Sequence, residues 1–245
     1  MLSKTKVKYI QSLGHKKRRD EDGVFIAEGP KIVKELLSIQ RVQPVEIFAF
    51  EEWAMHTAIP RNVELNIITP EELEKITQLS TPHQVLGIFK QFKNVDEIIT
   101  KNKWVLMLDG IQDPGNIGTI IRIADWFGIE QIICSHACSN IYNPKVIQSS
   151  MASMARVGVM VTELTEWIND HPGNQYFAAT LDGEKITGVG RLKEGILMIG
   201  NESKGLDESL IKKANRHFTI PRIGKAESLN AAVATGIILS HLIDK

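Results

Sequence analysis

Three loops rich in glycine and polar side chains hold the residues of this chain that could do chemistry. They span residues 109–122 (DGIQDPGNIGTIIR), 198–205 (MIGNESKG) and 220–233 (IPRIGKAESLNAAV). The first two begin where a short apolar run of strand length ends. In a parallel sheet, loops at the carboxyl ends of the strands lie together and bind ligands. We therefore expect the three loops to form one site.

The first loop offers groups that suit an anion. Asn116 is expected to cap the helix that follows, whose amino end would present free N–H groups and a positive dipole end. Arg122 lies two turns into this helix. It should face away from the apolar stripe of Ile120, Ile123, Ala124 and Phe127, and so be free to bind an anion. The structural alternative is an ordinary turn with a surface arginine.

The other two loops supply acceptors and amides. Glu202 could accept hydrogen bonds from a ribose or an amino group, or could cap a helix. Ser228 and Asn230 open the last predicted helix, residues 228–242, where they would be ordinary capping residues. A nicotinamide-dependent oxidoreductase would share the α/β rhythm, but it needs a GxGxxG loop with an acidic residue about 20 positions on. Neither that loop nor a Walker loop is found in the sequence.

Alternating strand and helix patterns must position these loops. Apolar runs predict strands at residues 23–28, 45–49, 85–92, 104–108, 129–134, 175–180 and 195–199. Helices are expected between several of them, including residues 30–39. We predict an α/β protein with a largely parallel sheet. Its expected parts are an N-terminal domain (1–94), a polar linker (95–103) and a C-terminal domain (104–245).

The charge of the chain is balanced overall but uneven along its length. The 245 residues include 29 Lys or Arg and 29 Asp or Glu. Residues 1–34 nevertheless contain nine basic and four acidic residues, an excess of five positive charges. Such a patch can bind phosphate even on a neutral molecule. A solvated helix face is the alternative.

Other features bound the function classes. No apolar run of about 18 residues predicts a membrane span, and the polar N-terminus lacks the apolar core of a signal peptide. The two cysteines, Cys134 and Cys138, do not complete a zinc site, and no metal is expected. A disulfide between them is geometrically allowed, but free thiols in a reducing cytoplasm are favoured. The histidines in the expected loops, His15, His83 and His171, are assigned no role.

In their order and spacing, the three loops resemble the signature motifs of the SpoU (TrmH) family within the SPOUT methyltransferases. The matching residues are 113–118 (DPGNIG) with Arg122, Gly200-Asn201-Glu202 with Gly205, and Pro221 with residues 227–230 (ESLN). The resemblance is strong over residues 104–245. Residues 1–92 more loosely resemble the family's ribosomal-protein-like RNA-substrate-binding domain.

Two departures from the family pattern are visible. Ala152 stands where the family usually has a glycine, and Ala231 and Ala232 stand where a valine is more usual. We expect both to alter packing without loss of activity.

The resemblance implies a fold, a cofactor and partners. It implies a SPOUT-type α/β knot with a deep C-terminal trefoil knot, preceded by a smaller α/β domain. It further implies a cytoplasmic homodimer that uses S-adenosyl-L-methionine to methylate a ribose 2′-hydroxyl of RNA. Ribosomal RNA is favoured over transfer RNA. A non-catalytic RNA-binding protein is the remaining alternative, and the intact motif residues argue against it.

The resemblance also assigns residues. The implied catalytic set is Arg122, Asn116, Glu202, Ser228 and Asn230. Backbone groups of the loops would bind the cofactor at Thr180, Leu181, Ile199, Gly200, Ile220, Ser228 and Leu229, and RNA phosphates would contact Lys16, Lys17, Arg18 and Arg19. Because a guanidinium holds its proton firmly, Arg122 is expected to orient the ribose and stabilise the developing alkoxide rather than act as a base.

Overall fold

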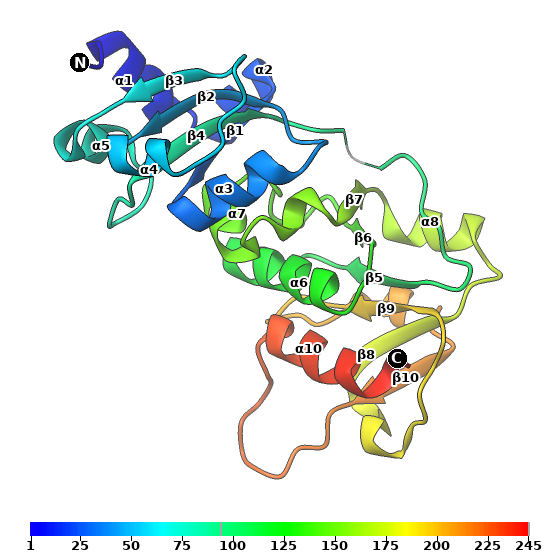
Figure 1. Cartoon of the computed structure of the whole chain (residues 1–245). Helices are drawn as coiled ribbons and strands as arrows, with labels where there is room; N and C mark the ends of the chain where they lie inside the picture. The colour runs from blue at the N-terminus through cyan, green and yellow to red at the C-terminus, as the bar shows by residue number, and fades with distance from the viewer. Residues whose placement is uncertain (94, 245) are drawn as a thin grey trace. The chain divides into compact units, whose positions relative to one another are not determined.

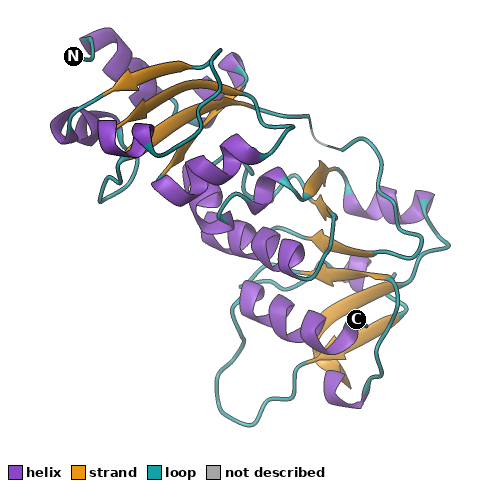
Figure 2. Ribbon diagram, viewed as in Figure 1, coloured by secondary structure: helices purple, strands orange, loops and turns teal. Residues whose placement is uncertain are grey.

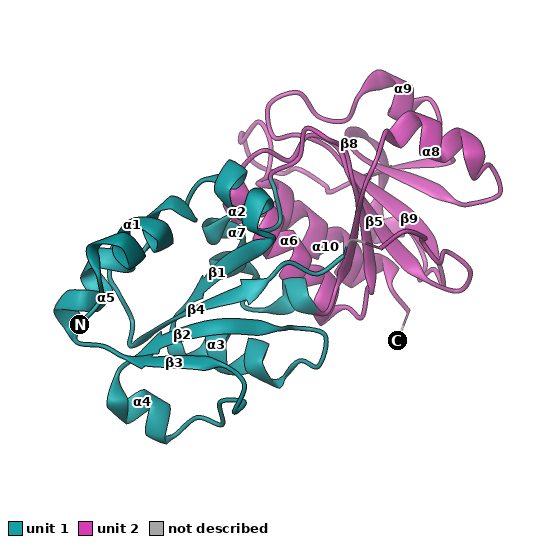
Figure 3. Ribbon diagram, turned by 90° about the horizontal axis from the view of Figure 1, so that it is seen from above, with its two compact units in different colours: residues 1–93, 140–155 teal, residues 94–139, 156–245 magenta. Residues whose placement is uncertain are grey.

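The computed structural model describes residues 1–93 and 95–244, which divide into two compact units (Figure 3). The first unit contains residues 1–93 together with residues 140–155, and the second contains the rest of the described chain. These units are defined by packing alone. The predicted division into residues 1–94, 95–103 and 104–245 therefore stays a prediction.

The first unit is built on a mixed four-stranded sheet with the order β1-β4-β2-β3 (Figure 1). β1 and β2 are antiparallel to β4, and β3 is parallel to β2. The strands are β1 (Val24–Glu28), β2 (Pro44–Ala49), β3 (Glu64–Ile67) and β4 (Val85–Lys90). The helices are α1 (Lys4–Ser12), α2 (Lys16–Asp22), α3 (Pro30–Ser38), α4 (Glu51–Met55), α5 (Pro70–Ile76) and α7 (Pro144–Ser150), with a 3-10 turn, η1 (Ser153–Ala155).

Apolar side chains from α1, α5 and the strands form the core on one face of this sheet, including Ile10, Phe48, Leu73 and Leu86. Capping residues explain where two of the helices begin or end. Thr69 and Glu72 make a reciprocal capping box at the start of α5, and Gly23 ends α2 in the left-handed conformation, φ +63°.

The segment containing α7 completes the first unit, although it lies far along the chain. α7 packs against β1. The Tyr142 ring stacks on Phe25 with centroids 5.3 Å apart. The Tyr142 hydroxyl donates to the Phe92 carbonyl (2.6 Å) and accepts from the Phe92 N–H (3.0 Å). Residues 140–155 are thus an integral part of this core.

The second unit is built on a six-stranded sheet with the order β10-β8-β9-β5-β6-β7, in which every pair is parallel (Figure 2). The predicted largely parallel sheet is therefore confirmed. The strands are β5 (Trp104–Leu108), β6 (Gln131–Cys134), β7 (Gly158–Val161), β8 (Tyr176–Lys185), β9 (Gly195–Ile199) and β10 (Arg216–Thr219). The helices are α6 (Pro114–Trp126), α8 (Leu164–Asp170), α9 (Glu208–Ile211) and α10 (Ala231–Leu242), with a 3-10 turn, η2 (Ile186–Gly188).

The central strands β5 and β9 are buried along their whole length, as expected of near-continuous apolar runs in a parallel sheet. α6 and α10 pack against each other. In the part of the chain that the structure describes, no helix is long and apolar enough to cross a membrane.

Candidate functional site

The amino end of α6 differs from the expectation for the first loop. Asp113 caps this helix, because its Oδ1 accepts from the Asn116 N–H at 2.9 Å. Pro114 occupies the first helical position, where its missing N–H costs nothing, so the residue before it is the cap. Asn116 is therefore the third residue of the helix. The prediction that it caps α6 is wrong, and its side chain is left for other contacts.

Asn116 instead joins the second and third loops. Its Nδ2 donates to Glu202 Oε1 (2.5 Å), and its Oδ1 accepts from Asn230 Nδ2 (2.8 Å). Asn230 in turn caps α10, because its Oδ1 accepts from the N–H groups of Ala232 and Val233. Because both its nitrogen and its oxygen are hydrogen-bonded, the orientation of the Asn116 side-chain amide is fixed. One hydrogen-bonded line of side chains links the three predicted motifs.

The last helix begins later than expected. It starts at Ala231 rather than Ser228, because Asn230 and not Ser228 is its cap. Ser228 and Leu229 precede the helix and are exposed. The structure therefore brings Asn116, Glu202 and Asn230 into contact, and leaves Ser228 outside this line.

Arg122 lies two turns into α6 with an exposed side chain. Among residues 1–93 and 95–244, the structure records no hydrogen bond or ion pair for its guanidinium. The helix buries Ile117, Ile120, Ile121 and Ala124 instead. The expected stripe is partly corrected, since Ile123 and Phe127 are only half-buried. The Arg122 side chain is therefore exposed, and its binding to an anion stays a prediction.

Three of the expected cofactor residues lie at the carboxyl ends of β9 and β10, and two lie within β8, the strand between them in the sheet. Ile199 ends β9, Gly200 follows it, and Ile220 follows β10. Thr180 and Leu181 lie where the pairing of β8 with β10 is interrupted, between Ala178 and Glu184. The Leu181 carbonyl accepts from Thr219 Oγ1 at 2.9 Å.

Gly200 lies in close contact with the backbone of Gly205 and Leu206. A Cβ at this position would lie 2.2 Å from both the Gly205 carbonyl carbon and the Leu206 nitrogen. Only glycine allows the second loop to close so tightly. That this turn binds the adenine edge of a cofactor stays a prediction.

The basic run in α2 does not act as one patch. Lys16 and Lys17 are exposed, with 89 % of the Lys17 side chain accessible. Arg18 is partly exposed and pairs with Glu21 and Asp22. Arg19 is 2 % exposed, and its Nη1 donates to the Leu13 and Gly14 carbonyls. Burial lowers the pKa of Arg19. The prediction that Arg19 contacts phosphate is therefore wrong, because its side chain is used inside the unit.

The two cysteines are free thiols, as predicted. Cys138 has contacts that the sequence did not reveal: its Sγ donates to the Leu108 carbonyl at 3.2 Å, where β5 ends. The pKa of Cys138 is lowered to about 7, chiefly by a hydrogen bond from Cys134. The same contact and burial raise the pKa of Cys134. No group of three or more metal-ligating side chains is found among the described residues.

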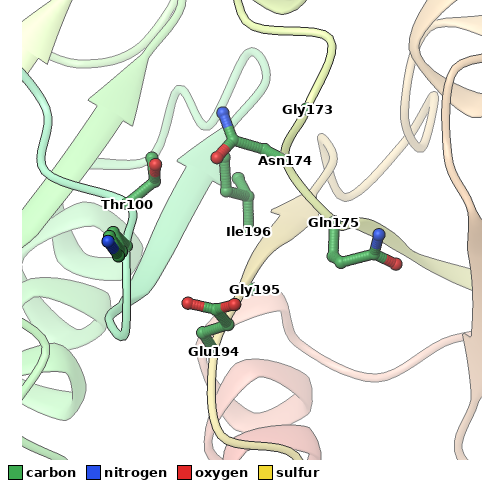
Figure 4. A pocket seen from close by; sticks show the side chains of 8 residues that line it. Thr100, Gly173, Asn174, Gln175, Glu194, Gly195 and Ile196 are labelled. Atoms are coloured by element: carbon green, nitrogen blue, oxygen red, sulfur yellow. The ribbon is translucent and has the colours of Figure 1, made fainter.

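A hollow of about 180 Å³ lies elsewhere on the second unit (Figure 4). Its lining includes Gln175, Glu194 and Ile196, at or just before the amino ends of β8 and β9. This is the edge of the sheet opposite the three loops. None of the predicted site residues lines this hollow, so it is not the predicted cofactor site.

Comparison with known proteins identifies the family of the chain. Residues 103–240 match the model of the SpoU rRNA Methylase family, and residues 4–87 match an MRM3-like substrate binding domain. The chain is 28 % identical over 240 residues to the 23S rRNA (guanosine(2553)-2′-O)-methyltransferase RlmP of Bacillus subtilis, covering 97 % of this chain and 95 % of that protein.

Two solved structures are similar over nearly the whole chain. One is a protein assigned to the TrmH family of RNA methyltransferases, from Porphyromonas gingivalis. It is 30 % identical, with a TM-score of 0.87, and covers 99 % of this chain and 98 % of that one. The other is an rRNA methyltransferase from Sinorhizobium meliloti with bound S-adenosylmethionine. It is 30 % identical, with a TM-score of 0.84, and covers 98 % and 95 %.

The parallel sheet, the three joined loops and these matches define an S-adenosylmethionine-dependent RNA ribose-2′-O-methyltransferase. The family-model match covers more than half of the chain. The chain belongs to the SpoU rRNA methylase family.

Proposed function

We propose that this enzyme methylates a ribose 2′-hydroxyl of ribosomal RNA, at a site formed by Arg122, Asn116, Glu202, Ser228 and Asn230. The observation that carries this site is the hydrogen-bonded line from Glu202 through Asn116 to Asn230. Ribosomal RNA is supported by the two similar proteins named for it, which match over nearly the whole chain. Transfer RNA is the alternative substrate.

The residues present fit the cofactor that the family uses. Gly200 closes the second loop tightly at the end of β9. The backbone at Gly200, Thr180, Leu181, Ile199, Ile220, Ser228 and Leu229 would form the binding segments. When bound, S-adenosyl-L-methionine supplies an electrophilic methyl group on a sulfonium. The loops would hold this group in a dry site. Exclusion of water favours the transfer because the sulfonium loses its positive charge in the transition state.

The polar side chains would act on the acceptor. Arg122 would bind the ribose and an adjacent phosphate, and would stabilise the alkoxide that develops on the 2′-oxygen as the hydroxyl proton passes to that phosphate. A guanidinium suits this role because it forms several directed, charge-assisted hydrogen bonds. Asn116, held at both ends, would orient the ribose or Arg122. Glu202, Ser228 and Asn230 would form the polar wall of the site.

Substitution of Arg122 tests this assignment. Arg122→Ala should lower kcat by about 100-fold or more, as losing one such charge-stabilising donor does, and leave the Kd for S-adenosylmethionine unchanged. Methyl transfer to ribosomal RNA and isothermal titration measure the two quantities. Arg61→Ala is the control, because Arg61 is also exposed but lies in the other unit. Wild-type activity in Arg122→Ala would remove Arg122 from the mechanism.

The first unit would capture the RNA. Lys16, Lys17 and Arg18 present cations on α2, and phosphate contacts from such side chains bind RNA without reading its sequence. The match of residues 4–87 to a substrate-binding domain supports this role.

We further propose that the enzyme is a cytoplasmic homodimer with a trefoil knot, as in its family. Large apolar side chains are exposed on two helices that pack against each other: Trp126 of α6 is 85 % exposed and Val233 of α10 is 51 % exposed. Such exposed apolar groups are typical of protein interfaces. For the knot, the support is the match of residues 103–240 to the SpoU rRNA Methylase family. Crystallographic tracing of residues 180–243 tests the knot.

A further inference from the structure

Asn201 is the residue that closes the second loop. It lies between Gly200 and Glu202, and its backbone N–H and carbonyl both bond to Gly205 (3.0 and 2.8 Å). Its Oδ1 accepts from the N–H groups of Ser203 (2.9 Å) and Lys204 (3.2 Å). The acceptor half of this one side chain therefore stabilises the turn that presents Glu202.

The donor half of the same side chain reaches the first loop. Asn201 Nδ2 donates to the Gly110 carbonyl at 2.7 Å. Gly110 is itself fixed, because it adopts φ +62° and its N–H donates to Ser135 Oγ at 2.9 Å. A second tie runs in parallel, from the Asp207 N–H to Asp109 Oδ2 (3.0 Å). The second loop is thus attached to the end of β5, from which the first loop leads to Asn116.

We infer that Asn201 is a positioning residue for methyl transfer, which holds Glu202 against Asn116 by fastening the second loop to Gly110. This inference rests on the site roles proposed above for Asn116 and Glu202. Glu202 is exposed and Asn116 half-buried, and a hydrogen bond between such groups contributes little by itself, because water competes for both. Their meeting therefore depends on the backbone that carries them. Asn201 is half-buried, and its side chain bonds the second loop to the backbone of the first loop at Gly110.

A substitution at residue 201 can remove the donor of the Asn201 side-chain amide and keep its acceptor. Asn201→Asp keeps an acceptor for Ser203 and Lys204, but it replaces the donor with an oxygen that faces the Gly110 carbonyl. The turn and Gly200 should stay in place while the tie between the loops is lost. We expect kcat to fall by about tenfold to 100-fold, the effect of a small misplacement of reacting groups. The Kd for S-adenosylmethionine should not change.

The effect of the hydrogen bond between Asn201 and Gly110 can also be measured by NMR, independently of activity. The side-chain amide resonances of Asn116 report its bonds to Glu202 and Asn230, and they should shift in Asn201→Asp without RNA or cofactor. Asn215→Asp is the matched control. Asn215 also binds backbone through its Oδ1, accepting from the Tyr176 N–H (2.7 Å), but at the amino end of β8. It introduces the same charge in the same unit and should change neither kcat nor the Asn116 signals.

Each alternative outcome contradicts the inference. Wild-type kcat and unshifted Asn116 signals in Asn201→Asp would show that the tie has no positioning role. A weaker Kd with unchanged kcat would make Asn201 a cofactor-binding residue instead. Asn201→Ser, which keeps a short acceptor without charge and is too short to span to Gly110, repeats the test should the aspartate variant unfold. Failure of the wild-type enzyme to methylate ribosomal RNA would count against the proposed substrate, while the Asn116 signals would still test the tie.

Discussion

Four consecutive basic residues in α2 show how like residues take unlike roles. Lys16 and Lys17 extend into solvent, whereas Arg19 is buried and bonds to two backbone carbonyls. The sequence predicted a single phosphate-binding run because composition does not tell which side of a seven-residue helix faces the core. Only the packing of α2 on β1 separates structural Arg19 from the exposed lysines.

Substitutions within this run should separate the two roles. Lys16→Glu with Lys17→Glu should weaken RNA binding and flatten its salt dependence, by about 0.7 to 0.9 in the log–log slope for each lost phosphate contact. Fluorescence anisotropy at several salt concentrations measures this slope. Arg19→Met is the internal control. It should lower the free energy of unfolding by about 1–3 kcal/mol, because the buried Leu13 carbonyl and the partly buried Gly14 carbonyl lose their donor, and should keep the slope. An unchanged slope in the double variant would place the RNA elsewhere.

At the same scale, residue types in the site were predictable but their partners were not. Asn116, Glu202 and Asn230 stood out from motif spacing, and the structure brings them together. The contact pattern depends on which residue caps each helix, and at α6 the sequence analysis expected Asn116 where the structure has Asp113. The proline at the first helical position was the signal that could have identified Asp113. Nothing in the sequence indicated that Asn201 spans two loops.

Among the elements, buried strands were predicted well and peripheral ones were missed. β5 and β9 are unbroken apolar runs, and their predicted bounds are confirmed. β3, β7 and β10 are four-residue edge strands, and β3 and β10 carry polar residues such as Asn66 and Arg216. Such strands bury little apolar surface, so their pattern cannot be distinguished from that of a loop. The register of both sheets and the edge strands β3, β7 and β10 therefore came only from the structure.

The turn after β9 has no room for a side chain at Gly200. Gly200→Ala would place a methyl group 2.2 Å from backbone atoms of Gly205 and Leu206, which cannot rotate away. We expect the turn to open, the free energy of unfolding to fall by about 1–3 kcal/mol, and binding of S-adenosylmethionine to weaken strongly. Isothermal titration and urea unfolding measure these effects. Gly190→Ala is the control, because a methyl group there meets open space. Normal cofactor binding by Gly200→Ala would exclude this turn from the cofactor site.

At the scale of the whole molecule, the zero net charge was a poor guide to function. It averages a basic N-terminal segment with a slightly acidic remainder, and a nucleic-acid enzyme is consistent with it. The alternation of strands and helices correctly predicted the α/β class. The assignment of residues 140–155 to the first unit could not be predicted, because long-range packing of Tyr142 on Phe25 leaves no periodic signal.

The proposed homodimer can be tested on the exposed apolar side chains. Trp126→Glu should shift the enzyme from dimer to monomer in sedimentation velocity, because a carboxylate buried in an interface without a partner is costly. Met55→Glu is the matched control. Met55 is 72 % exposed, but it lies on α4 of the first unit, and its substitution should leave the sedimentation coefficient unchanged. A wild-type enzyme that sediments as a monomer at micromolar concentration would contradict the proposal.

The contribution of residues 140–155 to the first unit affects how such an enzyme can be divided or recombined. The chain passes between the units three times, so a fragment ending at residue 93 would lack the tyrosine that covers Phe25 and bonds to Phe92. That fragment would expose an unfilled aromatic surface. Transplanting the N-terminal unit onto another methyltransferase would require moving two separate stretches of the gene together. The same requirement limits the exchange of this unit by recombination during evolution.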